Sequence, residues 1–473
     1  MALTAGSQRH DTTLKQQMAT DSLGNPVHLE DPSSLAAVND FVEGLIACEA
    51  RAVNVLNVGA RDRSTIVQAY CAALHMFAES PDAPANARPF ITAALTNAAA
   101  ASAREQGFAA AVAAWVDGDI SSAIRLHQQL AREYPRDLVS LKLGQYHLFN
   151  QGDAAGMLRL ALAALPHAAD VPYIHGMAAF GWEQCHLLAQ AETAARKAIA
   201  MCPKEPWAQH ALAHVMLTEG RLTEGLAFMR DSSATWTGLN SFMVTHNWWH
   251  LALFALELGH DGDVLRVYDE QVWGVVKEYS QDQIGAVSLL ARLELAGVQV
   301  ADRWQDVANY LMPRVHDHVL PFLDLQYLYG LARAGRPEAN TLLGSLEAHC
   351  LGITPAASST ADYAVMDDVW PRVCLPAARG LVAHAQGRYT EAVDELGAAL
   401  PRLMEIGGSH AQRDLFTQIH LDALMRAGNW SAAQQVLQQQ LRGQPQSIRL
   451  KRKAGQVYAM LGLGDVVSNI LAE

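Results

Sequence analysis

The chain has 473 residues, half of them hydrophobic, so it is long enough to bury a large core. It carries 35 Lys and Arg residues against 48 Asp and Glu residues, and the resulting formal net charge of -13 argues against nucleic acid as the main partner. A basic cluster, Arg449–Lys453, is typical of a solvated helix face.

Six cysteines are scattered along the chain without a CxxC pair, which indicates free thiols in a reducing compartment. The N-terminus is polar and lacks the apolar segment of a secretory signal. No run of about 18 apolar residues predicts a membrane span. We therefore expect a cytoplasmic protein that does not interact with a membrane.

The chain divides into three regions. Residues 1–35 are polar and predict an N-terminal arm, and residues 36–90 predict a helical segment. That segment ends in a proline-rich loop over residues 78–90, and a second loop is expected over residues 350–372. Residues 91–473 predict a helical repeat array. No alternating pattern is long enough to predict a sheet.

The repeat signal comes from prolines and small residues. Pro135, Pro166 and Pro203 follow predicted helices at intervals of 31 and 37 residues, which bracket the tetratricopeptide period of about 34. Small residues recur within the units, for example at Gly225 and Gly380, where they would let two helices of a hairpin approach closely. The pattern predicts an all-α protein, an α-solenoid of tetratricopeptide-like helical hairpins wound into a right-handed superhelix.

Two predicted helices each carry a pair of histidines four residues apart, His210 with His214 and His246 with His250. This spacing places both imidazoles of a pair on one helix face. Two such helices close in sequence could bring four imidazoles together. A single pair on an apolar face is usually structural. Seven of the ten tryptophans lie between residues 182 and 304, where they either pack helix junctions or form a pocket wall.

The same spacing suits metal chelation, because two imidazole nitrogens can converge on one ion. However, the chain has no HExxH motif, and neither histidine pair encloses a glutamate. We therefore expect no bound metal and favour a polar organic ligand. The cofactor remains unknown.

Further polar candidates follow in the segment Arg303–Asp306 and at His318 and Asp324. His318 and Asp324 are six residues apart and cannot share one helix face, but they could approach the site from separate turns. Ordinary helix-end polar residues are the alternative interpretation.

The segment 406–418 has the sequence IGGSHAQRDLFTQ. Its two glycines permit a positive φ, and Ser409 can cap the helix that follows. Backbone amides there, with Arg413 one turn inside, would suit an anionic group. The alternative is a capped helix in which Arg413 and Asp414 form structural ion pairs.

The strings WAQHALAHVMLTEGR, HNWWHLALFALELG, RWQDV, DHVLPFLD and GGSHAQRDLF, in that order, resemble the tetratricopeptide repeat protein 38 family over roughly residues 100–470. The resemblance implies an α-solenoid with degenerate repeats and no generally established activity. His410 stands where Asn is equally acceptable, so it receives no catalytic role. The family-specific positions are His210, His214, His246, Asn247, Trp249, His250, Arg303, Asp306, Asp317, His318, Asp324, Gln412, Arg413, Asp414 and Gln418.

Our first hypothesis is an inner pocket that binds, and could hydrolyse or otherwise convert, a small polar or anionic molecule. His214 and His250 would act as general acid or base, because imidazole titrates near neutrality, and Asp414 would orient a histidine. The expected ligand-binding residues are His210, His246, Asn247, Trp249, Arg303, His318, Asp324, Gln412 and Arg413.

The second hypothesis is a protein-interaction scaffold that binds a peptide in its concave groove, which is the usual role of such arrays. Peptide clamps in these arrays use Lys and Arg, whereas the inward candidates here are His and Trp. The sequence leaves open whether the chain is an enzyme, and it is compatible with a homo-oligomer.

Overall fold

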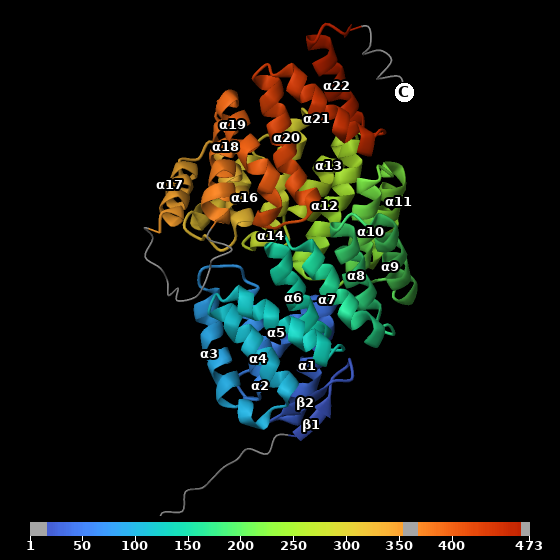
Figure 1. Ribbon diagram of the computed structural model, residues 1–473, viewed down its shortest axis with the longest axis vertical. Helices are drawn as coiled ribbons and strands as arrows, with labels where there is room; N and C mark the ends of the chain where they lie inside the picture. Colours follow the sequence, from blue (N-terminus) through green and yellow to red (C-terminus); the bar gives the residue numbers. More distant parts are fainter. Residues whose placement is uncertain (1–16, 353–367, 465–473) are drawn as a thin grey trace, which may run out of the picture.

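The computed structural model describes residues 17–352 and 368–464. Antiparallel helices stack along an elongated body, with a short β-hairpin at one end and the helix α22 at the other (Figure 1). The predicted all-α fold, a solenoid of helical hairpins, is confirmed. No helix in the described ranges combines the length and apolarity that a bilayer crossing requires.

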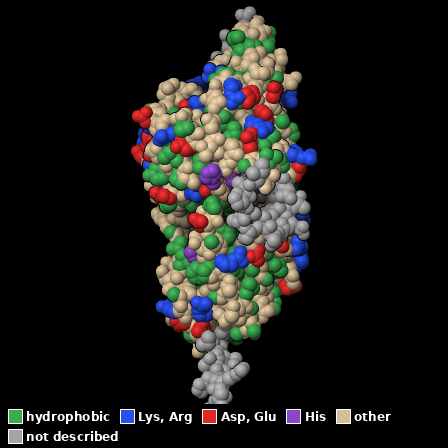
Figure 2. Space-filling model, turned by 90° about the vertical axis from the view of Figure 1, so that its left-hand side faces the viewer, with side chains coloured by type: hydrophobic (Ala, Val, Ile, Leu, Met, Phe, Trp, Pro, Cys, Tyr) green, Lys and Arg blue, Asp and Glu red, His purple; other side chains and the backbone are tan. Residues whose placement is uncertain are grey.

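The first eleven helices are α1 Leu35–Ile46, α2 Thr65–Met76, α3 Ala83–Thr96, α4 Ala103–Val116, α5 Ile120–Glu133, α6 Leu138–Asn150, α7 Ala154–Ala164, α8 Pro172–Gln184, α9 Leu188–Met201, α10 Pro206–Thr218 and α11 Leu222–Ser232. The later helices are α12 Ser241–Glu257, α13 Asp261–Val267, α14 Ser280–Leu295, α15 Arg303–Leu311, α16 Pro321–Arg333, α17 Glu338–Cys350, α18 Leu375–Ala385, α19 Tyr389–Ala399, α20 His410–Arg426, α21 Trp430–Gly443 and α22 Ile448–Met460. On the face shown in Figure 2, Lys and Arg side chains are interspersed with Asp and Glu.

Small residues let the helices of a hairpin approach closely, as the sequence predicts. Gly225 on α11 lies directly against the Phe254 ring of α12, with no room for a Cβ atom. On α18, a Cβ at Gly380 would lie 3.0 Å from the backbone nitrogen of Leu396 on α19. Gly220 follows α10 with a φ of +70°, a conformation that glycine adopts at little cost.

The N-terminal region contains a two-stranded antiparallel sheet, β1 Gln17–Thr20 with β2 Pro26–Leu29. Val27 and Leu29 are fully buried, and Arg104 donates a hydrogen bond of 2.9 Å to the Pro26 carbonyl. The sequence pattern did not predict this small sheet. Each strand has only four residues, too few for an alternating pattern to stand out.

The loop expected over residues 78–90 is shorter than predicted, because α3 begins at Ala83. Pro84 lies in the first turn, where the missing N–H is not needed. Pro89 lies inside the helix and removes one backbone hydrogen bond, but Ala87 and Ile91 are buried and their packing offsets this loss. Most of the second expected loop, residues 353–367, lies outside the described residues.

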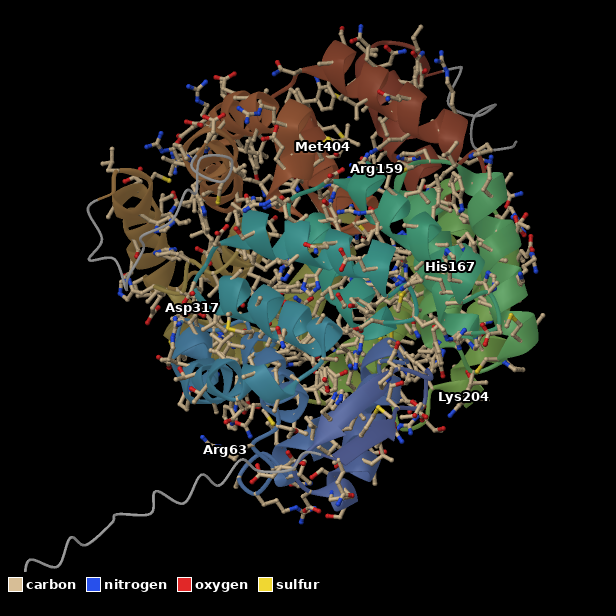
Figure 3. All side chains as sticks on the ribbon, turned by 60° about the horizontal axis from the view of Figure 1, so that its bottom comes forward. Arg63, Arg159, His167, Lys204, Asp317 and Met404 are labelled. Atoms are coloured by element: carbon tan, nitrogen blue, oxygen red, sulfur yellow. The ribbon has the colours of Figure 1, made fainter. Side chains whose placement is uncertain are left out.

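The C-terminal part of the chain folds back onto the first half. Gly407 and Gly408 both have a positive φ, and a Cβ at Gly407 would lie 3.0 Å from the backbone of Asn150, the last residue of α6. Met404, in the 3-10 helix η9 Leu400–Ile406, lies beside α7, which carries Arg159 (Figure 3). This return path brings His410, the first residue of α20, against Glu183 on α8.

The helix α10 begins with a buried acidic cap. Glu205 is 1% exposed and accepts hydrogen bonds from the backbone N–H groups of Trp207 and Ala208. Pro206 then occupies the first helical position. Burial raises the pKa of the Glu205 carboxyl to about 7 despite these bonds.

Replacing Gly225 with Ala should destabilise the protein by about 1–3 kcal/mol, because the Phe254 ring leaves no room for a methyl group. Gly344 on α17 is the matched control, since a Cβ there would meet nothing within 4 Å. Gly344→Ala should be neutral or stabilising by up to about 1 kcal/mol. Chemical denaturation of both variants measures the difference, and equal effects would contradict this packing.

Replacing Glu205 with Gln should change how stability depends on pH. The folded protein favours protonated Glu205, so this residue contributes stability below its ordinary pKa of 4.5 that is lost as the pH rises through about 7. The variant lacks this loss, so its stability relative to wild type should increase between pH 5 and pH 8 by at most about 3 kcal/mol. Denaturation at both pH values tests this, and a pH-independent difference would refute it.

Candidate functional site

The four histidines predicted from the sequence lie together between α10 and α12. His210 and His214 project from α10, and His246 and His250 project from α12. Each histidine offers a ring nitrogen, and these four atoms all lie within 4.8 Å of one another. The i, i+4 spacing within each helix and the packing of the two helices therefore combine the two pairs into one cluster.

The His210 Nε2 atom occupies the centre of this cluster. It lies 3.1 Å from His214 Nε2 and 3.1 Å from His246 Nε2. One imidazole nitrogen carries either one proton or one lone pair, so it cannot form two full hydrogen bonds to other ring nitrogens. Ligand nitrogens around tetrahedral zinc, at Zn–N distances of about 2.0–2.1 Å, are about 3.3 Å apart. The observed separations are close to that value.

The cluster is buried and rich in polar atoms without partners. His214 and His250 are 0% exposed, and His246 is the most exposed of the four at 9%. Among the described residues, neither ring nitrogen of His250 has a hydrogen-bond partner, and neither polar side-chain atom of Asn247 has one. Each such atom costs about 1–3 kcal/mol when desolvated. Burial also lowers the pKa of all four imidazoles, which favours their neutral, lone-pair-bearing forms.

A buried glutamate that the sequence analysis missed adjoins the cluster. Glu183 lies near the end of α8 and is 0% exposed. Its Oε2 atom lies 3.5 Å from His214 Nδ1, and its Oε1 atom contacts His410 Nε2 on α20. Burial raises the pKa of Glu183, but the two imidazoles lower it further, so the net shift is downward. Its only sequence signal is that it is the single acidic residue of α8.

A narrow cavity of about 10 Å³ opens beside His246 and Trp249. This volume is close to the space that one water molecule needs. Gln326 on α16 lines the cavity, and both polar atoms of its amide are buried without a partner in the described part of the chain. Gln412 on α20 lines it too. The cavity can therefore hold a water-sized molecule beside the cluster, with amide groups to bind it.

The polar segment on α20 has mainly structural contacts. Ser409 caps the helix, as predicted, and the Gln412 side chain accepts a 2.9 Å hydrogen bond from the Ser409 N–H in return. Arg413 donates to the Gly407 and Gly408 carbonyls, and burial lowers its pKa to about 10. The Asp414 carboxylate accepts a 2.6 Å hydrogen bond from Gln418. None of these described contacts joins Asp414 to a histidine.

Arg303 is not brought to the histidines. It lies at the start of α15 and forms a bidentate, partly exposed ion pair with Asp269, at 2.8 and 2.6 Å. Asp306, one turn later, binds Lys277 and the Trp273 indole N–H. Both contacts lie at the surface of the solenoid.

His318 and Asp324 do pair, at a second place in the fold. Asp324 Oδ2 lies 2.6 Å from His318 Nδ1, and His318 Nε2 lies 2.7 Å from the Ser345 hydroxyl on α17. This order of groups is that of a nucleophilic triad. However, the same hydroxyl also lies 2.9 Å from His316 Nδ1, and Ser345 does not line the cavity beside His246. We therefore interpret the arrangement as a link between α16 and α17.

No protein-family model matches the chain. Among solved structures, it is similar to the structure of Naa15/Naa10 bound to HypK-THB, with 11% identity over 92% of this chain and 68% of that chain, at a TM-score of 0.25. It is also similar to the crystal structure of the P58(IPK) TPR domain, with 10% identity over 78% of this chain and 91% of that chain, at a TM-score of 0.20. Similarity this low carries no argument about function, and the resemblance to the tetratricopeptide repeat protein 38 family stays a prediction.

Proposed function

We propose that His210, His214, His246 and His250 bind one divalent transition-metal ion inside the solenoid. The observation that carries this proposal is the convergence of four buried imidazoles, with ligand atoms within 4.8 Å of one another. Metal coordination would satisfy ring nitrogens that otherwise lack partners among the described residues. Neutral imidazoles suit zinc, copper, iron and nickel, and zinc is the first candidate because it accepts four nitrogen ligands in a compact site.

Glu183 would support such an ion indirectly, by binding a histidine that is itself a metal ligand. Histidines that bind a metal commonly donate their other ring N–H to a carboxylate, which fixes the ring and makes it a stronger ligand. His214 directs Nε2 toward the cluster and Nδ1 toward Glu183. The carboxylate also supplies negative charge that partly balances a buried cation.

This proposal differs from the organic ligand and the absence of metal expected from the sequence. That expectation depended on the lack of an acidic residue between the paired histidines, whereas the nearby acid, Glu183, comes from another hairpin. The cavity of about 10 Å³ beside His246 is also far smaller than the roughly 300 Å³ of a small-molecule site. As metal ligands, His214 and His250 would not serve as general acid or base.

The scaffold hypothesis finds no support in these residues. His210, His214 and His250 are at most 1% exposed, so a peptide on the solenoid surface would not reach them. A peptide partner would have to bind other surfaces of the array.

Protein produced without a histidine tag should contain about one equivalent of transition metal per chain, measured by elemental mass spectrometry. His250→Gln should lose this metal, because it removes one of the four ligands. His175→Gln is the matched control. His175 is also buried, but its ring bonds to the carbonyl of Ala169, six residues away, and it is not one of the four clustered histidines. The proposal would be ruled out if the wild-type protein took up no metal after zinc was added. It would also be ruled out if the His250→Gln variant retained a full equivalent of metal.

Replacing Glu183 with Gln should weaken metal affinity by roughly 10- to 100-fold without abolishing binding, because the four ligands remain. Glu192→Gln serves as the control, since that carboxylate, on α9, pairs with Arg221 at 2.8 Å and does not contact the four histidines. Competition with a chromophoric chelator measures both affinities. Unchanged affinity in Glu183→Gln would show that the carboxylate does not support the metal.

A further inference from the structure

A second, larger cavity lies at the C-terminal end of the solenoid, away from the histidine cluster. It has a volume of about 460 Å³ and lies between α22 and the ends of α14 and α20. This size is typical of small-molecule sites, which range over about 300–1,000 Å³. It shares no lining residue with the cavity beside His246.

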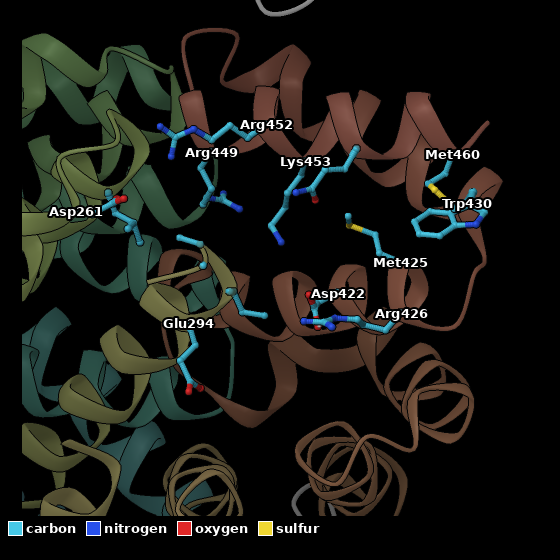
Figure 4. A pocket seen from close by; sticks show the side chains of 15 residues that line it. Asp261, Glu294, Asp422, Met425, Arg426, Trp430, Arg449, Arg452, Lys453 and Met460 are labelled. Atoms are coloured by element: carbon cyan, nitrogen blue, oxygen red, sulfur yellow. The ribbon is translucent and has the colours of Figure 1, made fainter. Parts of the chain in front are cut away.

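Two buried cations on α22 line this cavity. Arg449 and Lys453 are four residues apart on one helix face and are only 6% and 7% exposed. Both side chains reach from α22 toward the space between α22 and α20 (Figure 4). The sequence pattern had placed them on a solvated face, and for these two residues that interpretation was wrong.

Neither cation is fully paired. Arg449 Nε donates a 2.7 Å hydrogen bond to Glu257, but its Nη1 atom is buried without a partner among the described residues. Lys453 has no ion pair within 4.0 Å in the described part of the chain. Burial accordingly lowers the Lys453 pKa.

Two acidic residues of the cavity wall pair with groups other than Arg449 and Lys453. The Asp422 carboxylate lies 3.0 Å from His384 Nε2, and Glu294 pairs with Arg333 at 2.8 Å. Asp261 lies at the start of α13, on the side of Arg449 (Figure 4). Asp422 attracts Lys453, but among the described residues no carboxylate lies within 4.0 Å of its ammonium group, so an anion in this cavity would be favoured.

The remaining wall combines apolar and cationic groups. Trp430, Met425 and Met460 line the end of the cavity that is farthest from Arg449 (Figure 4). Arg452 and the largely exposed Arg426 add further positive charge to the lining. An aromatic group could pack on Trp430 while an anionic group reaches Lys453.

We propose that this cavity binds a small organic phosphate that carries an aromatic or other flat apolar group. The phosphate would accept a hydrogen bond from the Lys453 ammonium group, next to the positive charge of Arg449. The apolar group would lie against Trp430 and the two methionines. This site is independent of the proposed metal ion, so removing the metal with a chelator should leave the binding unchanged.

Calorimetric titration of the full chain with phenyl phosphate tests the proposal. Phenyl phosphate should bind, inorganic phosphate should bind more weakly, and phenol should not bind measurably. Lys453→Met should weaken phenyl phosphate binding at least about tenfold, whereas Lys451→Met, on the same helix but outside the cavity lining, should not. No binding by wild type at about 10 mM phenyl phosphate, or equal binding by Lys453→Met, would overturn the proposal.

Thermal unfolding without ligand supplies a second measurement. Because Lys453 lacks a close counter-charge, Lys453→Met should raise the melting temperature of the ligand-free protein. A lower melting temperature would show that Lys453 stabilises the fold, for example through Asp422, and would contradict a cation kept for a ligand.

Discussion

The interior of this solenoid is organised around one constraint, which is that buried imidazole nitrogens must find partners. The packing of α10 on α12 brings two histidine pairs together in a place that is almost closed to solvent. Hydrogen bonds among the rings satisfy only part of the cluster, and both nitrogens of His250 are left over in the described structure. The surrounding helices also supply polar groups beside these nitrogens. Glu183 supplies a carboxylate from α8, and α20 covers the site with His410 and Gln412. A metal ion is the one partner that would satisfy several of these nitrogens at once.

The two sites differ in how they manage charge. The histidine cluster is composed of neutral groups with one adjacent carboxylate, so it can accept a small cation at a modest electrostatic cost. The cavity at α22 has the opposite character, because Lys453 is a buried cation and the carboxylates of Asp422 and Glu294 pair with other residues. Arg449 is a second cation there, paired with Glu257.

The sequence predicted local features well and long-range ones poorly. The helical hairpins, their small contact residues such as Gly225, and the Ser409 cap follow from periodicity and short-range chemistry, and the structure contains them. The face-sharing of each histidine pair follows from the helix repeat alone. The place of Glu183 in the site could not be predicted. Its contact with His410 joins two residues that are 227 positions apart in the sequence. Arg303 was assigned to the site through its polar character, yet a local partner, Asp269, holds it at the surface.

The return of the chain at Gly407 and Gly408 also sets an order of events. All four histidines and Glu183 lie within the first 250 residues, whereas the covering helix α20 starts at position 410. During synthesis the N-terminal hairpins therefore emerge, and can pack, well before their cover exists. An ion could enter the cluster in that interval without any opening of the finished fold. Once α20 has docked, His410 and Gln412 lie beside the buried cluster, so the loaded protein should exchange its ion slowly compared with a surface site.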